Sequence, residues 1–446
     1  MIFLDIDSSF FKMKNKKQNI FILIYYAILV LIMMSRKDAA SEPSMVLRLA
    51  FMAAVVFPAV LFRNVSYPAV ITLFYTLVIF GFSYSYLPYT YDIYVGITFF
   101  ITIFFFNKNW NKNVVPPFLL FFTFYIFIID LIYSLSNYQV SIVENISYSF
   151  MLLVFFIIII GDNIQGVLSQ LSVAFIIITI VLSYLFIENR ELFAVDFGEG
   201  LERSGWTDHN YFGCVIGMGT VISMFNIFDA KWYNKKIIEK IFYISALLIS
   251  VPVLILNASR GALLSVIIVF VLLVTFSNVK LGYKIVIFIL SVIGCIYLYT
   301  NDYFALLEAR IQSDDGTGSG RTEIWSAKLD GYLDGNIFQI IFGNGFYGGG
   351  TIGGRLIGFH NDYLGFLVDY GIVGLCMLLY MLYYPIKLVP KNSKIKILII
   401  ASIAYLAICF LTLEPFLTGI LPYFSFYLYA FLLAKNEKNN QVKFIS

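Results

Sequence analysis

The chain has 446 residues, of which 60% are hydrophobic and only 13% are charged, and its net charge is +3. This composition lies outside the range of ordinary soluble domains, and so small a net charge argues against a nucleic-acid surface. The sequence therefore indicates an all-α polytopic membrane protein.

Apolar runs close to the ~20 residues that cross a bilayer recur along the chain. From these runs we expect about 14 transmembrane helices, in a range of roughly 11–14. The predicted spans are 20–34, 45–62, 66–85, 91–106, 115–136, 146–160, 168–187, 209–229, 241–256, 261–277, 285–300, 361–384, 397–415 and 417–434.

Two long polar segments divide these spans. The predicted parts are N-terminal helices in 1–187, central helices in 188–300 with an outer segment at 188–208, a large extracytoplasmic loop at 301–360, C-terminal helices in 361–434 and a cytoplasmic tail at 435–446. We expect the tail to be disordered, because it is short, polar and terminal.

The distribution of basic residues predicts the orientation. With the N-terminus in the cytoplasm, most basic residues fall in cytoplasmic loops, as the positive-inside rule requires, and both termini are cytoplasmic. The inner basic residues are almost all lysine, whereas most of the outer ones are arginine. Because arginine binds phosphate and carboxylate bidentately, the outer face is predicted to recognise an anion. Arginine that only reaches toward lipid headgroups is the alternative.

The four cysteines, Cys214, Cys295, Cys376 and Cys409, lie inside apolar runs without metal-ligand spacing. We expect them to be small core residues, and the sequence predicts no disulfide, metal site or cofactor.

Arg260 stands between two apolar runs that leave almost no loop, at the predicted outer boundary of the membrane. A charge held there is costly without a partner, which makes Arg260 a functional candidate, although a helix-end arginine can also contact lipid headgroups. In the preceding outer segment, Arg203 is a second candidate for binding phosphate. Asn210 is a candidate substrate-binding residue or a plain helix cap.

The long loop carries further candidates. The stretch 319–325 predicts a turn into a short helix that begins near Arg321, and Arg310 and Arg355 lie in the same loop. Eight glycines between Gly343 and Gly358 include a formal G-x-G-x-x-G, but no βαβ unit surrounds it, so we exclude a dinucleotide site. We expect these glycines to let backbone N–H groups approach a bulky anion.

His360 stands directly before Asn361 and Asp362, where the chain becomes apolar again. The start of the following helix should favour the neutral imidazole, which is the form that a general base needs. A histidine that only caps or packs is the alternative. His209, at the start of another span, competes for the role, and Asp369 follows one to two turns along roughly the same helix face as Asp362.

Several stretches resemble the O-antigen ligase and polymerase superfamily of bacterial envelopes. They are Ser259-Arg260-Gly261, the run from Gly320-Arg321 to Trp325 that leads to Phe342-Gly343-Asn344-Gly345, and His360-Asn361-Asp362-Tyr363-Leu364 followed by Asp369-Tyr370-Gly371. The resemblance extends over residues 203–385, and the family often has proline where this chain has His209.

The resemblance implies a GT-C-like, metal-independent glycosyltransferase of the bacterial inner membrane. Its substrates would be an undecaprenyl-diphosphate-linked glycan donor and a glycan acceptor, bound at the extracytoplasmic face. We hypothesise an inverting transfer in which His360 is the base while Arg260 and Arg321 stabilise the diphosphate. The predicted substrate-binding residues are Arg203, Asn210, Arg310, Arg355, Asn361 and Asp362.

A polymerase that joins repeat units of capsule, exopolysaccharide or O-antigen is the first expectation, and a chain-length regulator protein would be its partner. A ligase that moves the finished glycan onto lipid A core of lipopolysaccharide, or onto another acceptor, stays open. A flippase or transporter is the alternative from a different class. It should place ionisable groups deep in the helices, and only Arg48, Asp130 and Glu414 qualify.

Overall fold

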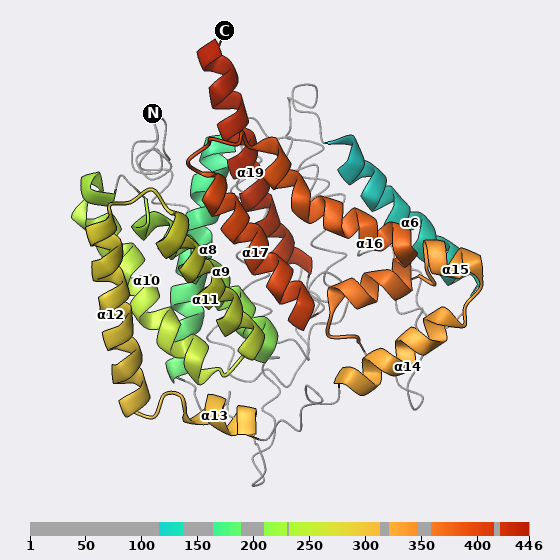
Figure 1. The fold of residues 1–446 in the computed structure, drawn as a ribbon, viewed down its shortest axis with the longest axis horizontal. Helices are drawn as coiled ribbons and strands as arrows, with labels where there is room; N and C mark the ends of the chain where they lie inside the picture. Colours follow the sequence, from blue (N-terminus) through green and yellow to red (C-terminus); the bar gives the residue numbers. More distant parts are fainter. Residues whose placement is uncertain are drawn as a thin grey trace, which may run out of the picture. The chain divides into compact units, whose positions relative to one another are not determined.

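The structure is a computed structural model that describes residues 116–136, 164–188, 209–229, 232–312, 321–345, 358–413 and 420–445 (Figure 1). All regular elements in these ranges are helices. The chain divides into one unit from Ile2 to Ala174 and another from Phe175 to Ser446. The predicted spans at 20–34, 45–62, 66–85, 91–106 and 146–160 lie outside the described residues.

The remaining predicted spans are helices. They are α6 (Pro117–Ser136), α8 (Ile164–Glu188), α9 (His209–Ile227), α10 (Ile237–Leu256), α11 (Arg260–Phe276), α12 (Leu281–Thr300), α16 (Asp362–Leu388), α17 (Lys396–Thr412) and α19 (Ile420–Ile445). Within the described ranges, four helices are long and apolar enough to cross a membrane: α9, α10, α12 and α16. Shorter apolar helices lie in α6, α8, α11 and α17. These helices, with the composition, indicate an integral membrane protein.

Helix α9 is central in the Phe175–Ser446 unit, since 89% of its apolar residues 210–227 are buried. Polar groups along it bond to neighbouring helices: the Tyr405 hydroxyl donates to the Cys214 carbonyl, and Thr220 Oγ1 donates to Ser250 Oγ at 2.9 Å. Such bonds are required because a bilayer offers a buried polar group no water.

Helix α12 is peripheral, since only 6% of its apolar stretch within Leu281–Thr300 is buried. Cys295 lies on it and is exposed, as is Cys376 on α16, so the expectation of four core cysteines is wrong for these two. An apolar run identifies a helix, but it does not identify which face of that helix meets other protein. The described cysteines are free thiols, and Cys214 and Cys409 are buried as expected.

The long loop folds into α13 (Ala305–Gln312), α14 (Arg321–Leu333) and α15 (Ile337–Phe342). Helix α14 begins at Arg321, as the sequence predicts. Tyr332 of α14 packs with Phe359 and Val368 in a small hydrophobic core, and its hydroxyl donates to the Ile340 carbonyl at 2.6 Å. Burial raises the pKa of the Tyr332 phenol, which keeps this donor protonated.

Helix α16 is kinked at Gly371, where φ is 66°. A Cβ at Gly371 would lie 2.2 Å from the Ile341 carbonyl oxygen, and a Cβ at Gly343, where φ is 86°, would lie 2.2 Å from the Asp369 carbonyl oxygen. The end of α15 therefore meets the kink backbone to backbone. The Gly345 N–H also donates to the Asp369 carbonyl at 2.8 Å, so at Gly343 and Gly345 the backbone approaches a helix. The glycines from 348 to 354 lie outside the described residues, and their approach to an anion stays a prediction.

The C-terminal tail also differs from expectation. Helix α19 continues through the predicted tail to Ile445. Because the apolar part of α19 already forms a helix, its last turn offers carbonyl acceptors on which the polar residues can continue the helix.

Candidate active site

The C-terminal end of α17 joins the long loop to the helices. Arg321 Nη1 donates to the Thr412 carbonyl oxygen at 3.0 Å. Thr412 is the last residue of α17, where carbonyl groups lack partners within the helix and carry partial negative charge. A guanidinium is well suited to that position, so the first residue of α14 is fixed against the end of α17.

The start of α11 lies at the same place. A Cβ on Gly261 would fall 2.2 Å from Thr412 Oγ1, so only glycine lets α11 approach α17 this closely. Arg260, the first residue of α11, precedes this contact and is partly exposed. Thr412 therefore brings together the ends of the two helices that begin with Arg260 and Arg321.

The turn before Arg260 is fixed by two contacts from other elements. Arg310 Nη1 of α13 donates to the Ala258 carbonyl at 2.6 Å, and Ala258 has a positive φ of 51°. Ser259 Oγ donates to Asn210 Oδ1 at 3.4 Å, which places the start of α9 beside this turn. Arg310 and Asn210 thus contact the turn that carries Arg260. Their predicted binding of substrate stays a prediction.

The His360 segment reaches the end of α17 through Asp362, two residues further along the chain. The Asp362 N–H donates to the Leu413 carbonyl at 3.0 Å. Asn361 is the N-cap of α16, and its Oδ1 accepts from the N–H groups of Tyr363 at 3.0 Å and Leu364 at 3.2 Å. Asn361 and Asp362 are both buried, whereas His360 is partly exposed and has a φ of 51°.

Asn361 and Asp362 therefore build the helix start, while His360 itself stands in a left-handed conformation that few non-glycine residues adopt. Asp369, expected to lie near Asp362 on the same face, is buried and belongs to the half of α16 before the kink.

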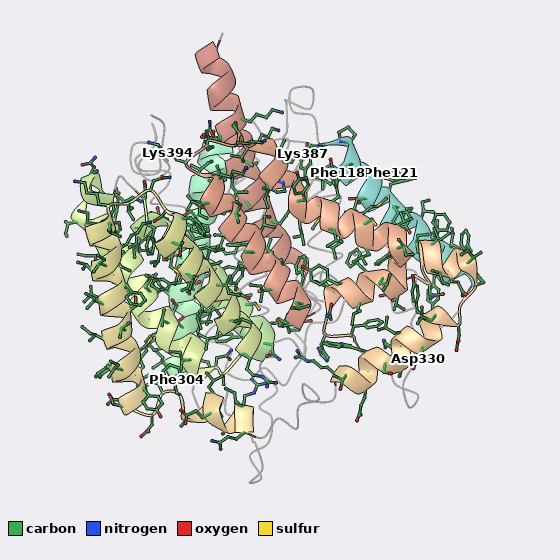
Figure 2. All side chains as sticks on the ribbon, in the orientation of Figure 1. Phe118, Phe121, Phe304, Asp330, Lys387 and Lys394 are labelled. Carbon is green, nitrogen blue, oxygen red and sulfur yellow. The ribbon has the colours of Figure 1, made fainter. Side chains whose placement is uncertain are left out.

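We define the arginine end as the region formed by Arg260, Arg310, Arg321, His360 and Thr412. The opposite ends of these helices carry lysine: Figure 2 shows Lys387 and Lys394 far from Phe304 and Asp330, which lie with the loop helices. Lys387 and Lys394 therefore lie away from the arginine end.

Arg203 and Arg355 lie outside the described residues, and for His209 only the backbone is described, as the first residue of α9. The Asn210 contact nevertheless puts that backbone beside the turn before Arg260.

The sequence interpretation missed three residues next to His360. Trp325 Nε1 of α14 donates to the Phe359 carbonyl at 2.7 Å. The Lys328 ammonium lies 4.3 Å from the centroid of the Phe359 ring, and both residues are buried. A usable signal was present, because Arg321, Trp325 and Lys328 recur at the spacing of one helix face.

Chemically, the arginine end combines positive charge at helix starts with a partly exposed imidazole. Arginine can stabilise a leaving group that gains negative charge, and imidazole can accept a proton from a hydroxyl. Such a combination suits the transfer of a group from an anionic leaving group to a hydroxyl.

Comparison with known families agrees with the resemblance. Residues 245–379 match the family model described as O-Antigen ligase. The match begins in α10 and ends in α16, so it contains Arg260, Arg310, Arg321 and His360. No curated protein matches the chain. Residues 245–379 are thus similar to the O-antigen ligase family, which supports the resemblance to the O-antigen ligase and polymerase superfamily.

Proposed function

We propose that the protein is an inverting membrane glycosyltransferase that polymerises undecaprenyl-diphosphate-linked repeat units of a bacterial surface polysaccharide. One observation carries the proposal: the end of α17 contacts the helix starts that bear Arg260 and Arg321 and the segment that bears His360. Arg260, Arg321, His360 and Thr412, which are 39 to 152 positions apart in the sequence, therefore share one end of the unit.

The proposed reaction begins at the acceptor. His360 removes the proton of an acceptor sugar hydroxyl, and the resulting oxygen attacks the anomeric carbon of the donor. The bond from that carbon to the diphosphate breaks with inversion, and undecaprenyl diphosphate leaves. Arg260 and Arg321 stabilise the negative charge on the departing diphosphate, so the transfer takes its positive charge from the chain itself.

The membrane arrangement follows from the same assignment. The arginine end faces the outside of the inner membrane, both termini are cytoplasmic, and the helices form a GT-C-like fold. Arg203 and Arg355 extend the site that binds the lipid-linked glycan, and a chain-length regulator protein sets how long the polymer grows.

A ligase is the second candidate, since the family description itself names ligase activity. It would use the same donor and the same residues, and would differ only in the acceptor, lipid A core or another molecule. A flippase is less well supported, because the candidate residues gather at one end of the helices instead of along their length.

Purified full-length protein in lipid nanodiscs can test these alternatives, with the lipid-linked glycan extracted from cells that lack the protein as substrate. A polymerase produces a ladder of longer glycans from this substrate without an added acceptor. A ligase gives no ladder and transfers glycan only when lipid A core is added. A protein that does neither, but moves the substrate across a vesicle membrane, would refute glycosyl transfer.

A further inference from the structure

One face of α14 contacts both the end of α17 and the segment before His360. Arg321, Trp325, Lys328 and Tyr332 occupy successive turns of the helix and share that face. Arg321 contacts Thr412, Trp325 and Lys328 contact Phe359, and Tyr332 packs in the same core as Phe359. The helix therefore links the arginine of the site to the residue that precedes His360.

The backbone around His360 is fixed on both sides. Before it, the Phe359 carbonyl accepts from Trp325 Nε1, and the Phe359 ring lies against the Lys328 ammonium. After it, the Asp362 N–H donates to the Leu413 carbonyl. The positive φ of His360 lies between these two anchors. A left-handed residue persists only where the surrounding contacts hold it there.

We infer that Trp325 and Lys328 are positioning residues that hold the His360 imidazole at the distance from Arg321 that the transfer needs. The inference rests on the proposed role of His360 as the base. In this assignment both residues act through Phe359, which each of them contacts. In this arrangement α14 sets the spacing between the group that accepts the proton and a group that binds the diphosphate.

The chemistry of each contact predicts which substitutions keep it. Lys328 is 2% exposed and Phe359 is 1% exposed, so their cation–π contact is shielded from water and depends on charge. Lys328→Arg retains that charge, whereas Lys328→Met fills a similar volume without it. Trp325→Phe retains an aromatic ring and removes only the indole N–H that holds the Phe359 carbonyl.

The test measures glycan transfer by the full-length protein in nanodiscs, with the lipid-linked glycan extracted from cells that lack the protein. We expect Trp325→Phe and Lys328→Met to lower kcat by about 10- to 100-fold, which is the effect of misplacing a reacting group by about 1 Å. The KM for the donor should change by less than about twofold, because neither residue binds it. Lys328→Arg and the exposed control Asp330→Asn should both retain transfer.

The decisive measurement repeats both substitutions in a His360→Ala protein. If Trp325 and Lys328 act through His360, the Trp325→Phe and Lys328→Met substitutions cause no further loss of transfer in a protein that already lacks the imidazole. Equal slowing in both backgrounds would overturn the inference while leaving the proposed function intact. A His360→Ala protein with wild-type transfer would instead refute the role of His360, and the inference with it. If Lys328→Met does not fold in a thermal unfolding measurement, Trp325→Phe alone gives the decision.

Discussion

Arg321 and Thr412 are 91 positions apart in the sequence, yet the Arg321 guanidinium donates to the carbonyl oxygen of Thr412, the last residue of α17, at 3.0 Å. This bond connects the first turn of a loop helix to the end of a membrane helix. A guanidinium has five N–H donors in a fixed fork, so one arginine can be anchored to protein and bind an anion at the same time. The fork geometry, and not the charge alone, is what the proposed site requires.

The first prediction follows from that geometry. Arg321→Lys and Arg260→Lys keep the positive charge but lose the bidentate fork, so each should reduce glycan transfer by about 10- to 150-fold. The control is Lys394→Arg, at the opposite end of the helices, which should leave transfer unchanged. Wild-type transfer in both arginine variants, at equal expression, would contradict the proposal that Arg260 and Arg321 bind the departing diphosphate.

A second prediction concerns the close approach of α11 and α17. Gly261→Ala places a methyl group against Thr412, so it should lower the free energy of unfolding by about 1–3 kcal/mol and also reduce transfer. Gly294→Ala is the matched control, because no atom lies within 4 Å of a Cβ at that position of α12. Thermal unfolding in detergent compares the stability of the two variants, and the nanodisc assay compares their glycan transfer. A Gly261→Ala protein as stable and active as the control would contradict the contact.

Within the described residues, the sequence predicted the helices well and their assembly poorly. Apolar runs located α9 to α12, α16 and α17 to within a few residues, because a membrane span has to be long, apolar and helical. The start of α14 at Arg321 was also predicted, since a serine and a glycine precede a polar helical stretch. These features are local, and local patterns are what a sequence displays directly.

What the sequence did not reveal depends on contacts between distant segments. Nothing in an apolar stretch ending at Thr412 and Leu413 indicates that their carbonyls hold two other segments. The positive φ of His360 and the kink at Gly371 arise from packing against α14, α15 and α17, and not from their immediate neighbours in sequence. The sequence predicted that the glycine-rich stretch approaches an anion, but at Gly343 the glycine packs against the backbone of α16.

A third prediction tests the orientation in the membrane. With the arginine end outside, Asp330→Cys should react with a membrane-impermeant maleimide in intact cells, whereas Lys394→Cys should react only after the cells are opened. The parent protein supplies the background, because its four cysteines all lie within helices. The reverse pattern would place the site in the cytoplasm, where the proposed polymerisation could not occur.

The last prediction separates a base from a scaffold at His360. As a base, His360 contributes about 10²–10⁴-fold to transfer, so His360→Asn should lose that factor although asparagine tolerates a positive φ and can cap a helix. Binding of undecaprenyl diphosphate should persist, because the arginines remain. If His360 only shapes the turn before Asn361, asparagine should restore transfer.

The same assay on His209→Asn compares the two histidines of the chain. His209 begins α9, whose next residue, Asn210, contacts the turn before Arg260, so the backbone of His209 lies beside that turn. We expect His209→Asn to retain most of the transfer. A His209→Asn protein that binds undecaprenyl diphosphate normally but transfers no glycan, beside an active His360→Asn protein, would move the proton acceptor from the start of α16 to the start of α9.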